Sequence, residues 1–395
     1  MDNVYFDYAA TTPVDARVLD AMLPFFNERF GNANSLYALG RDAYRGLEEA
    51  RETVAAAIGA ASPDEVIFTS GGTESDNAGL IGILTKLAPE GGAHLIVSAL
   101  EHHAILEPAH YLEKQGYEVT VLAPRKSGHI HPDDLRAAMK PNTKLVSVMH
   151  ANNEIGTINP IRELAEVAHE GGALFHTDAA QTLGKIPFDV VALGIDAASF
   201  SSHKIYGPKG FGALYLKKRT PFNTIQRGGG QEFKKRSGTQ NTPGAAGFAK
   251  ALELMLADQA SEIVRLSALR DKVINGVLGS LENTQCTTAV EPRLPHIVSL
   301  LINGVEGEAM LLQLDNKGIA VSTGSACSSG SLEPSHVLLA VGCPPEIAHG
   351  SLRISLGRFT TEQDVDYFLE VFPPIVERLR SMSPVYEKMF GGASK

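Results

Sequence analysis

The chain has 395 residues, of which 44% are hydrophobic and 20% charged, and its formal net charge is −10. These values are typical of a globular protein with at least one large core. The acidic balance argues against a general nucleic-acid surface, and no apolar run is long enough to span a membrane. We therefore expect neither a nucleic-acid partner nor a membrane partner.

Three cysteines, at positions 286, 327 and 343, are too few for a disulfide framework. The spacing Cys-x-x-Cys is absent, so we expect no intrinsic metal site. This cysteine usage and the absence of a secretory signal at the N-terminus fit a reducing cytoplasm. Cys327 stands apart because glycines and serines surround it between Ser322 and Ser331, a composition typical of an exposed, mobile loop.

Seven apolar segments of strand length alternate with helical patterns in the first part of the chain. Several of them are apolar on both faces, as buried parallel strands are. The alternation predicts an α/β domain whose mostly parallel seven-stranded sheet has helices on both faces. The segments are residues 65–70, 94–100, 117–123, 144–151, 173–179, 197–202 and 211–217.

The pattern changes after about residue 242, where helices become more frequent than strands. A long helix over about 243–281 is predicted first, and a closing helix is expected to break at Pro373 and Pro374. We predict a large domain over residues 12–260 and a smaller α+β domain made of residues 1–11 and 261–395. The strands expected in the smaller domain are residues 297–304, 319–324 and 352–357.

Polar residues after the strands are the first functional candidates, because ligands of such sheets bind beyond the carboxyl ends of strands. Gly72 and Thr73 begin a helix that suits a phosphate, although a simple helix cap explains them equally well. His102 and His103 are adjacent, so at most one of them faces a given site as a base or a ring-stacking group. Asn153 is either a turn former or a ligand for a carboxylate.

The next two strands end in residues with more specific chemistry. Asp178 ends an apolar strand, where burial requires a cation or a donor such as a protonated ring nitrogen, and Gln181 lies three residues further on. Lys204 follows beside Ser201 and His203 as a Schiff-base candidate, with a surface lysine as the plainer alternative. Together the candidates offer partners for a phosphate, a ring nitrogen, an aldehyde and an aromatic ring, which are the four handles of pyridoxal 5′-phosphate.

The order of these segments resembles that of the cysteine desulfurases, which are class V aminotransferase relatives with the aminotransferase-like pyridoxal-phosphate fold type I. The longer loop around the cysteine, about residues 322–333, is similar to that of the nitrogen-fixation and iron–sulfur-assembly branch. The resemblance runs from about residue 4 to 382 and is carried by FDYAATTP, TSGGTESDN, EHHA, NNEIG, HTDAAQTLGK, SSHKIYGPKG, RSGTQN, STGSACSSG and LRISLGR.

The resemblance implies a role for each matching residue. Lys204 would bind the aldehyde of the cofactor, His103 would stack on its ring and move protons, and Cys327 would be the nucleophile. Asp178 would pair with the ring nitrogen, and Gln181 with the ring hydroxyl. The implied phosphate ligands are Gly72, Thr73, Ser201 and His203, with Thr239 from a second subunit, and the implied ligands of the substrate carboxylate are Asn153 and Arg353.

The implied reaction converts L-cysteine to L-alanine and leaves the sulfur on Cys327 as a persulfide for iron–sulfur cluster assembly. The implied partners are a second copy of the chain and an iron–sulfur scaffold protein or another sulfur acceptor, with which Cys327 would transiently ligate a cluster. Two alternatives stay open. One is another pyridoxal-phosphate enzyme, such as a selenocysteine lyase or a transaminase, and the other is a silent sulfur-carrier or scaffold-binding protein.

Overall fold

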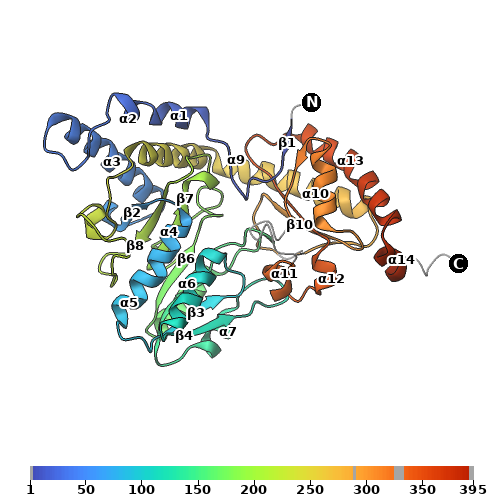
Figure 1. The fold of residues 1–395 in the computed structure, drawn as a ribbon, viewed down its shortest axis with the longest axis horizontal. Helices are drawn as coiled ribbons and strands as arrows, with labels where there is room; N and C mark the ends of the chain where they lie inside the picture. The colour runs from blue at the N-terminus through green and yellow to red at the C-terminus, as the bar shows by residue number, and fades with distance from the viewer. Residues whose placement is uncertain (1–2, 288–290, 324–332, 391–395) are drawn as a thin grey trace.

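Seven strands form the central sheet of the computed structural model, which describes residues 3–287, 291–323 and 333–390 (Figure 1). Their order is β2-β8-β7-β6-β5-β3-β4, and β8 alone runs antiparallel to its neighbours in this sheet. All seven predicted strands and the mostly parallel sheet are confirmed. The strands are β2 (Val66–Thr69), β3 (His94–Ser98), β4 (Glu118–Leu122), β5 (Thr143–Ser147), β6 (Leu174–Asp178), β7 (Ala197–Ser201) and β8 (Gly212–Leu216).

Helices cover both faces of this sheet, which explains why its central strands β5, β6 and β7 are buried along almost their whole length. In β3, Ile96 packs into one apolar cluster while Leu95 and Val97 pack into another, because successive side chains point to opposite faces. The first cluster includes side chains of α3 (Ala38–Ala57), α7 (Pro132–Ala138) and α8 (Ile161–Glu170). The second includes those of α5 (Ile83–Leu87) and α6 (His103–Lys114).

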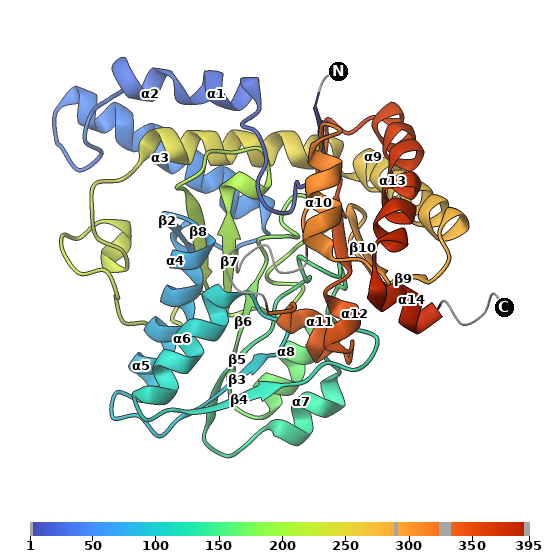
Figure 2. The same ribbon diagram turned by 45° about the vertical axis from the view of Figure 1, so that its right-hand side comes forward.

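A smaller α+β part lies beside the large sheet (Figure 2). Three antiparallel strands in the order β12-β10-β9 and the parallel pair β1-β11 share one apolar core with α10 and α13. Its strands are β1 (Val4–Tyr5), β9 (Thr284–Cys286), β10 (Ile297–Ile302), β11 (Ile319–Ala320) and β12 (Ser351–Ser355). Its helices are α10 (Gly307–Asp315), α11 (His336–Ala340), α12 (Pro345–Ala348), α13 (Glu362–Ser381) and α14 (Pro384–Phe390).

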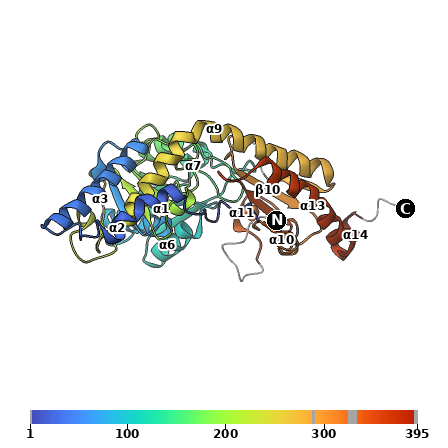
Figure 3. The same cartoon turned by 90° about the horizontal axis from the view of Figure 1, so that it is seen from above.

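Helix α9 (Thr242–Ser280) contributes to both parts and runs along one side of the molecule (Figure 3). Phe248 and Leu252 in its first half pack into the core of the large sheet. Val273 and Val277 in its second half pack into the core of the smaller part. The predicted long helix is confirmed, and the predicted domain boundary at residue 260 falls between these two sets of contacts but stays a prediction.

The closing helix α13 differs from the expectation, because Pro373 and Pro374 lie inside it and the helix continues to Ser381. Phe372 and Val376 on either side of the prolines are buried in the smaller core. Apolar packing of a helix face is the main source of helix stability in proteins, and here it offsets the two missing backbone donors. Among the described residues, no helix is both long and apolar enough to cross a membrane.

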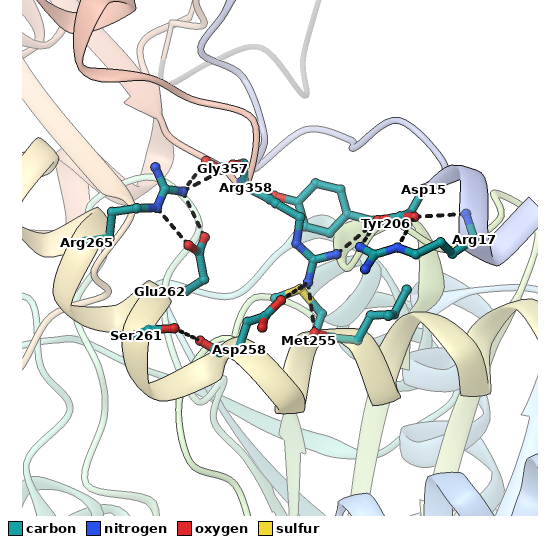
Figure 4. A network of polar contacts seen from close by, with 11 residues as sticks. Asp15, Arg17, Tyr206, Met255, Asp258, Ser261, Glu262, Arg265, Gly357 and Arg358 are labelled. Carbon is teal, nitrogen blue, oxygen red and sulfur yellow. Dashed lines mark hydrogen bonds and ion pairs between the residues drawn. The ribbon is translucent and has the colours of Figure 1, made fainter.

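Two arginines join the segment after β12 to the large part and to α9 (Figure 4). Arg358 donates from Nη1 to Oδ2 of Asp15 at 3.1 Å, at the start of α1 (Ala16–Met22), and its guanidinium lies 5.2 Å from the ring centre of Tyr206. Arg265 of α9 donates to the carbonyl of Gly357 at 3.0 Å. These contacts fix how β12 meets the large sheet. The short helix α2 (Pro24–Asn27) connects α1 to the loop before α3.

Candidate active site

A cavity of about 320 Å³ opens at the carboxyl ends of the parallel strands, between the sheet and the smaller part. It is lined by residues from the ends of several strands, from the N-terminal segment and from β12. The fold thus brings together candidates that are far apart in the sequence. The predicted residues in its wall are Gly72, Thr73, Asn153, Asp178, Gln181, Ser201, His203, Lys204 and Arg353.

Lys204 lies in a single helical turn, Ser202–Lys204, directly after β7. Its Nζ donates to the carbonyl oxygens of Ala9 and Ala10, each at 2.7 Å. Both carbonyls belong to the N-terminal segment, which therefore forms part of the cavity wall. The two acceptors hold the amine in the cavity wall, where the aldehyde of a bound ligand can reach it.

Asp178 is the last residue of β6 and is 7% exposed. Its Oδ1 accepts a hydrogen bond from the backbone N–H of Ala180 at 2.8 Å. Burial raises the pKa of this carboxyl, whereas the Ala180 N–H and the charge of Lys204 act in the opposite direction. A buried carboxylate with one backbone donor can accept a further charged partner, such as a protonated ring nitrogen.

The helix after β2 begins at Gly72 as α4 (Gly72–Asn77) and continues without a break into α5. A Cβ atom on Gly72 would lie 3.5 Å from Cβ of Ser201, so the glycine leaves room next to this hydroxyl. His203 contacts Oγ1 of Thr11 through Nδ1 at 3.0 Å, and burial lowers its pKa to about 4, so its ring is neutral at physiological pH. Helix N–H groups and neutral donors of this kind suit a phosphate.

Arg353 of β12 reaches the cavity from the smaller part and is 4% exposed. Its Nη2 donates to Oδ1 of Asp7 at 2.7 Å, and its Nη1 donates to the carbonyl of Asn153 at 3.2 Å. Among the described residues, its Nε has no hydrogen-bond partner although it is buried. An unpaired guanidinium N–H next to a cavity is suited to a carboxylate ligand.

The structure corrects the choice between the two adjacent histidines. His102 lines the cavity with Asp178 and Lys204, whereas the side chain of His103 is 45% exposed and lines a neighbouring surface hollow, which His102 also borders. The physical reason is the start of α6, where His102 is the N-cap and its Nδ1 accepts from the N–H of Ala104 at 3.1 Å. The first helical residue, His103, consequently points away from the cavity. Burial, followed by the nearby charge of Lys204, lowers the pKa of His102 to about 4.

Besides His103, the predicted phosphate ligand Thr239 does not line this cavity. Thr239 lines a separate cavity of about 180 Å³ with Ser70 and Arg236, so it lies apart from Lys204 within one chain. Cys327 lies outside the described residues. Among the residues that the structure does describe, no group of three or more histidine, cysteine, aspartate or glutamate side chains is arranged to hold a metal ion.

Sequence reasoning missed several residues that shape the site. Asp7, Ala9 and Ala10 belong to the segment FDYAATTP, which was singled out in the sequence but given no role. Asp76 lines the cavity, and Lys185 contacts the cavity residue Gln181; they belong to the segments TSGGTESDN and HTDAAQTLGK and were likewise given no role. Their importance follows from burial, which becomes visible only in the folded chain.

Comparison with known proteins places this site in a family. The family model described as aminotransferase class-V matches residues 4–368. The cysteine desulfurase IscS of Dictyoglomus turgidum is 51% identical over 382 residues, which cover 97% of this chain and 96% of that protein. Fold, site and this similarity agree: the chain belongs to the cysteine desulfurases of the aminotransferase class-V family.

Solved structures agree with this assignment. A NifS-like protein superposes with a TM-score of 0.89 at 38% identity, covering 95% of this chain and 100% of that chain. SspA in complex with cysteine superposes with a TM-score of 0.79 at 34% identity, covering 91% of this chain and 100% of that chain. These similarities confirm the predicted aminotransferase-like fold.

Proposed function

We propose that this protein binds pyridoxal 5′-phosphate and removes the sulfur of L-cysteine, leaving L-alanine and a persulfide on Cys327. The observation that carries the proposal is that one cavity contains the amine of Lys204, the buried carboxylate of Asp178 and the Nε–H of Arg353, which has no partner among the described residues. When bound, pyridoxal phosphate supplies an electron sink that takes up charge from the substrate carbon.

The residues of the cavity fit each part of this cofactor. Gly72, Thr73, Ser201 and His203 would hold the phosphate at the start of the helix that begins with α4. Asp178 would pair with the ring nitrogen and Gln181 with the ring hydroxyl. Lys204 would bind the aldehyde, and the ring of His102, rather than that of His103, would cover one face of the cofactor.

Different side chains would bind the substrate and move its protons. Arg353 and Asn153 would bind the carboxylate of cysteine, which fixes its Cα beside Lys204. Lys204 would take the proton from Cα and later return one to the product, because the amine is at the same cavity wall. His102 would assist with its Nε2, since its Nδ1 already accepts from the backbone of Ala104.

Sulfur transfer balances without an external oxidant. The thiolate of Cys327 would form a bond to the substrate sulfur while the substrate C–S bond breaks, and the electron pair of that bond would stay with the substrate carbon. Protonation of this carbon gives alanine, and Cys327 retains the sulfur as a persulfide. A thiolate is required because the thiol itself is a weak nucleophile.

The wider role of the persulfide belongs to the same proposal. We expect a homodimer in which Thr239 of each chain completes the phosphate site of the other, because Thr239 lies apart from the cavity of its own chain. An iron–sulfur scaffold protein or another acceptor would receive the sulfur, and Cys327 would transiently share an iron–sulfur cluster as cargo with it. A cytoplasmic location fits this role.

Incubation of the purified protein with pyridoxal phosphate, L-cysteine and a reductant tests the proposal. Sulfide and alanine should form in equal amounts, and mass spectrometry should find one added sulfur on Cys327. Cys327→Ala should abolish sulfide release but keep the absorbance of the bound cofactor, whereas Lys204→Ala should lose that absorbance band. Full desulfuration by Cys327→Ala would favour a lyase, and loss of the amino group of cysteine without sulfide release would favour a transaminase. A purified protein that binds no cofactor would favour a silent carrier.

A further inference from the structure

Asp76 is a buried acid in the cavity wall to which the proposed reaction assigns no role. It lies in α4, is 1% exposed and faces the same cavity as Lys204 and Asp178. Within the part of the chain that the structure describes, its Oδ1 makes no hydrogen bond. A buried carboxyl oxygen without a partner is costly, so its charge state has to be explained.

The imidazole closest to Asp76 cannot balance a negative charge. Nε2 of His176 is 3.9 Å from Oδ1 of Asp76, which is beyond hydrogen-bond distance. Its two ring nitrogens already contact Oγ of Ser147 at 2.8 Å and Oγ of Ser199 at 3.0 Å. Burial lowers the pKa of His176 to about 3, so this ring is neutral at physiological pH.

The other charged groups around Asp76 are mostly acidic. Burial, followed by the charge of Asp178, raises the pKa of Asp76 well above its usual range, and a hydrogen bond with Ser199 opposes this only in part. Burial also raises the pKa of Glu101 to about 8. The amine of Lys204 is directed to the carbonyls of Ala9 and Ala10. One ring nitrogen in the cavity would balance one carboxylate but not two.

We propose that Asp76 is a positioning residue that keeps its carboxyl proton while Asp178 stays ionised, so that a neutral hydrogen-bond donor stands in the cavity wall beside a single carboxylate. The proposal rests on the proposed function, because the single negative charge, on Asp178, would pair with the protonated ring nitrogen of bound pyridoxal phosphate. The proton of Asp76 would limit the site to one negative charge, and its hydrogen bond with Ser199, which pairs with Asp178 between β7 and β6, would support the position of Asp178.

Asparagine is the matched substitution, since it has the shape of a neutral aspartic acid and also carries a donor. We expect Asp76→Asn to bind pyridoxal phosphate within about twofold of the wild type. Asp76→Ala, which removes the carboxyl group that contacts Ser199 beside Asp178, should bind it about tenfold more weakly. Titration of the apoproteins at about pH 8 measures these constants, and circular dichroism verifies that each variant is folded.

An infrared spectrum of the apoprotein tests the proton itself, without cofactor or activity. The background combines Glu101→Gln with Glu154→Gln, because burial raises the pKa of Glu101 to about 8 and that of Glu154 to about 7. At about pH 7, the band of a protonated carboxyl group should be present in this background and absent when Asp76→Asn is added.

An unchanged infrared spectrum would overturn the proposal, as would about tenfold weaker binding by Asp76→Asn or undiminished binding by Asp76→Ala. Failure of the wild type to bind pyridoxal phosphate would overturn the proposed function instead. In that case the infrared comparison still decides the charge state of Asp76.

Discussion

The side-chain amine of Lys185 lies 3.2 Å from Oε1 of Gln181 and 3.4 Å from Nε2 of His296. The amine donates to Oε1, which directs the amide nitrogen of Gln181 to the carbonyl of Ala9 at 3.0 Å. Burial, followed by the charges of Lys204 and Arg353, lowers the pKa of Lys185 to about 7. A lysine behind the cavity wall thus orients a residue that faces the cavity, and it does so at a cost in stability.

Lys185→Met should stabilise the apoprotein at neutral pH. The unfolded chain keeps the lysine proton up to a pKa near 10.5, whereas the folded chain releases it at about 7. Between these values the unfolded state binds more protons, so the penalty of burying the amine is complete below about pH 7 and fades as the pH rises towards 10. We expect a gain of about 2 to 4 kcal/mol at neutral pH, at about 1.4 kcal/mol for each pKa unit, and little gain near pH 10.

Denaturant unfolding of the apoproteins at both pH values measures this difference. Substitution of the exposed Lys86 by Met is the matched control and should change stability by less than about 0.5 kcal/mol. A gain from Lys185→Met that is the same at both pH values would show that the amine keeps its proton in the fold.

Substitution of His102 should slow alanine formation much more than substitution of the adjacent His103. His102→Gln removes a ring from the cavity and should lower the rate of alanine formation about a hundredfold or more. His103→Gln changes a half-exposed side chain and should stay within about twofold. Steady-state rates and the absorbance of bound pyridoxal phosphate measure both effects. Equal losses in the two variants would contradict this assignment.

The ion pair of Arg51 and Glu232 should contribute strongly to stability, because both side chains are almost completely buried. The carboxylate contacts the guanidinium at 2.7 and 2.9 Å and also accepts from the backbone N–H of Phe68 at 2.9 Å. Glu232→Ala leaves the buried guanidinium with the partly exposed Glu48, 3.1 Å from its Nε, as a carboxylate partner and should cost about 3 to 5 kcal/mol.

A surface pair provides the comparison for this prediction. Glu170 and Arg136 are both more than half exposed, and Glu170→Ala should cost less than about 1 kcal/mol. Chemical denaturation gives both free energies of unfolding. A small loss in Glu232→Ala would mean that the buried guanidinium finds other acceptors.

Arg353→Lys should weaken substrate binding more than turnover. The guanidinium has a fixed set of N–H groups that contact Asp7 and Asn153, and its Nε has no partner within the described part of the chain, whereas an ammonium is a point charge without this planar geometry. We expect KM for cysteine to rise about tenfold to a hundredfold and kcat to change about threefold or less. Arg162→Lys on the exposed face of α8 is the control. A change confined to kcat would place Arg353 elsewhere in the reaction.

Much of the fold was predictable because its signals are local. The strands of the large sheet have apolar runs that can be recognised without tertiary context. The sequence pattern over α9 predicts a helix along its whole length. The continuity of α13 through Pro373 and Pro374 was not predictable, because it depends on the core against which Phe372 packs.

The sequence by itself determined the family and the sheet, because residue types and their order are properties of the chain, and it predicted the chemistry of Lys204 and Asp178 at strand ends. Only the tertiary structure decided that His102 and not His103 faces the cavity, since one peptide unit at the start of α6 reverses the direction of a side chain. The shifted pKa values of Asp76 and Lys185 likewise arise only in the folded chain. Both groups have ordinary pKa values in water, and these values shift when burial removes the solvent that stabilises the charged form.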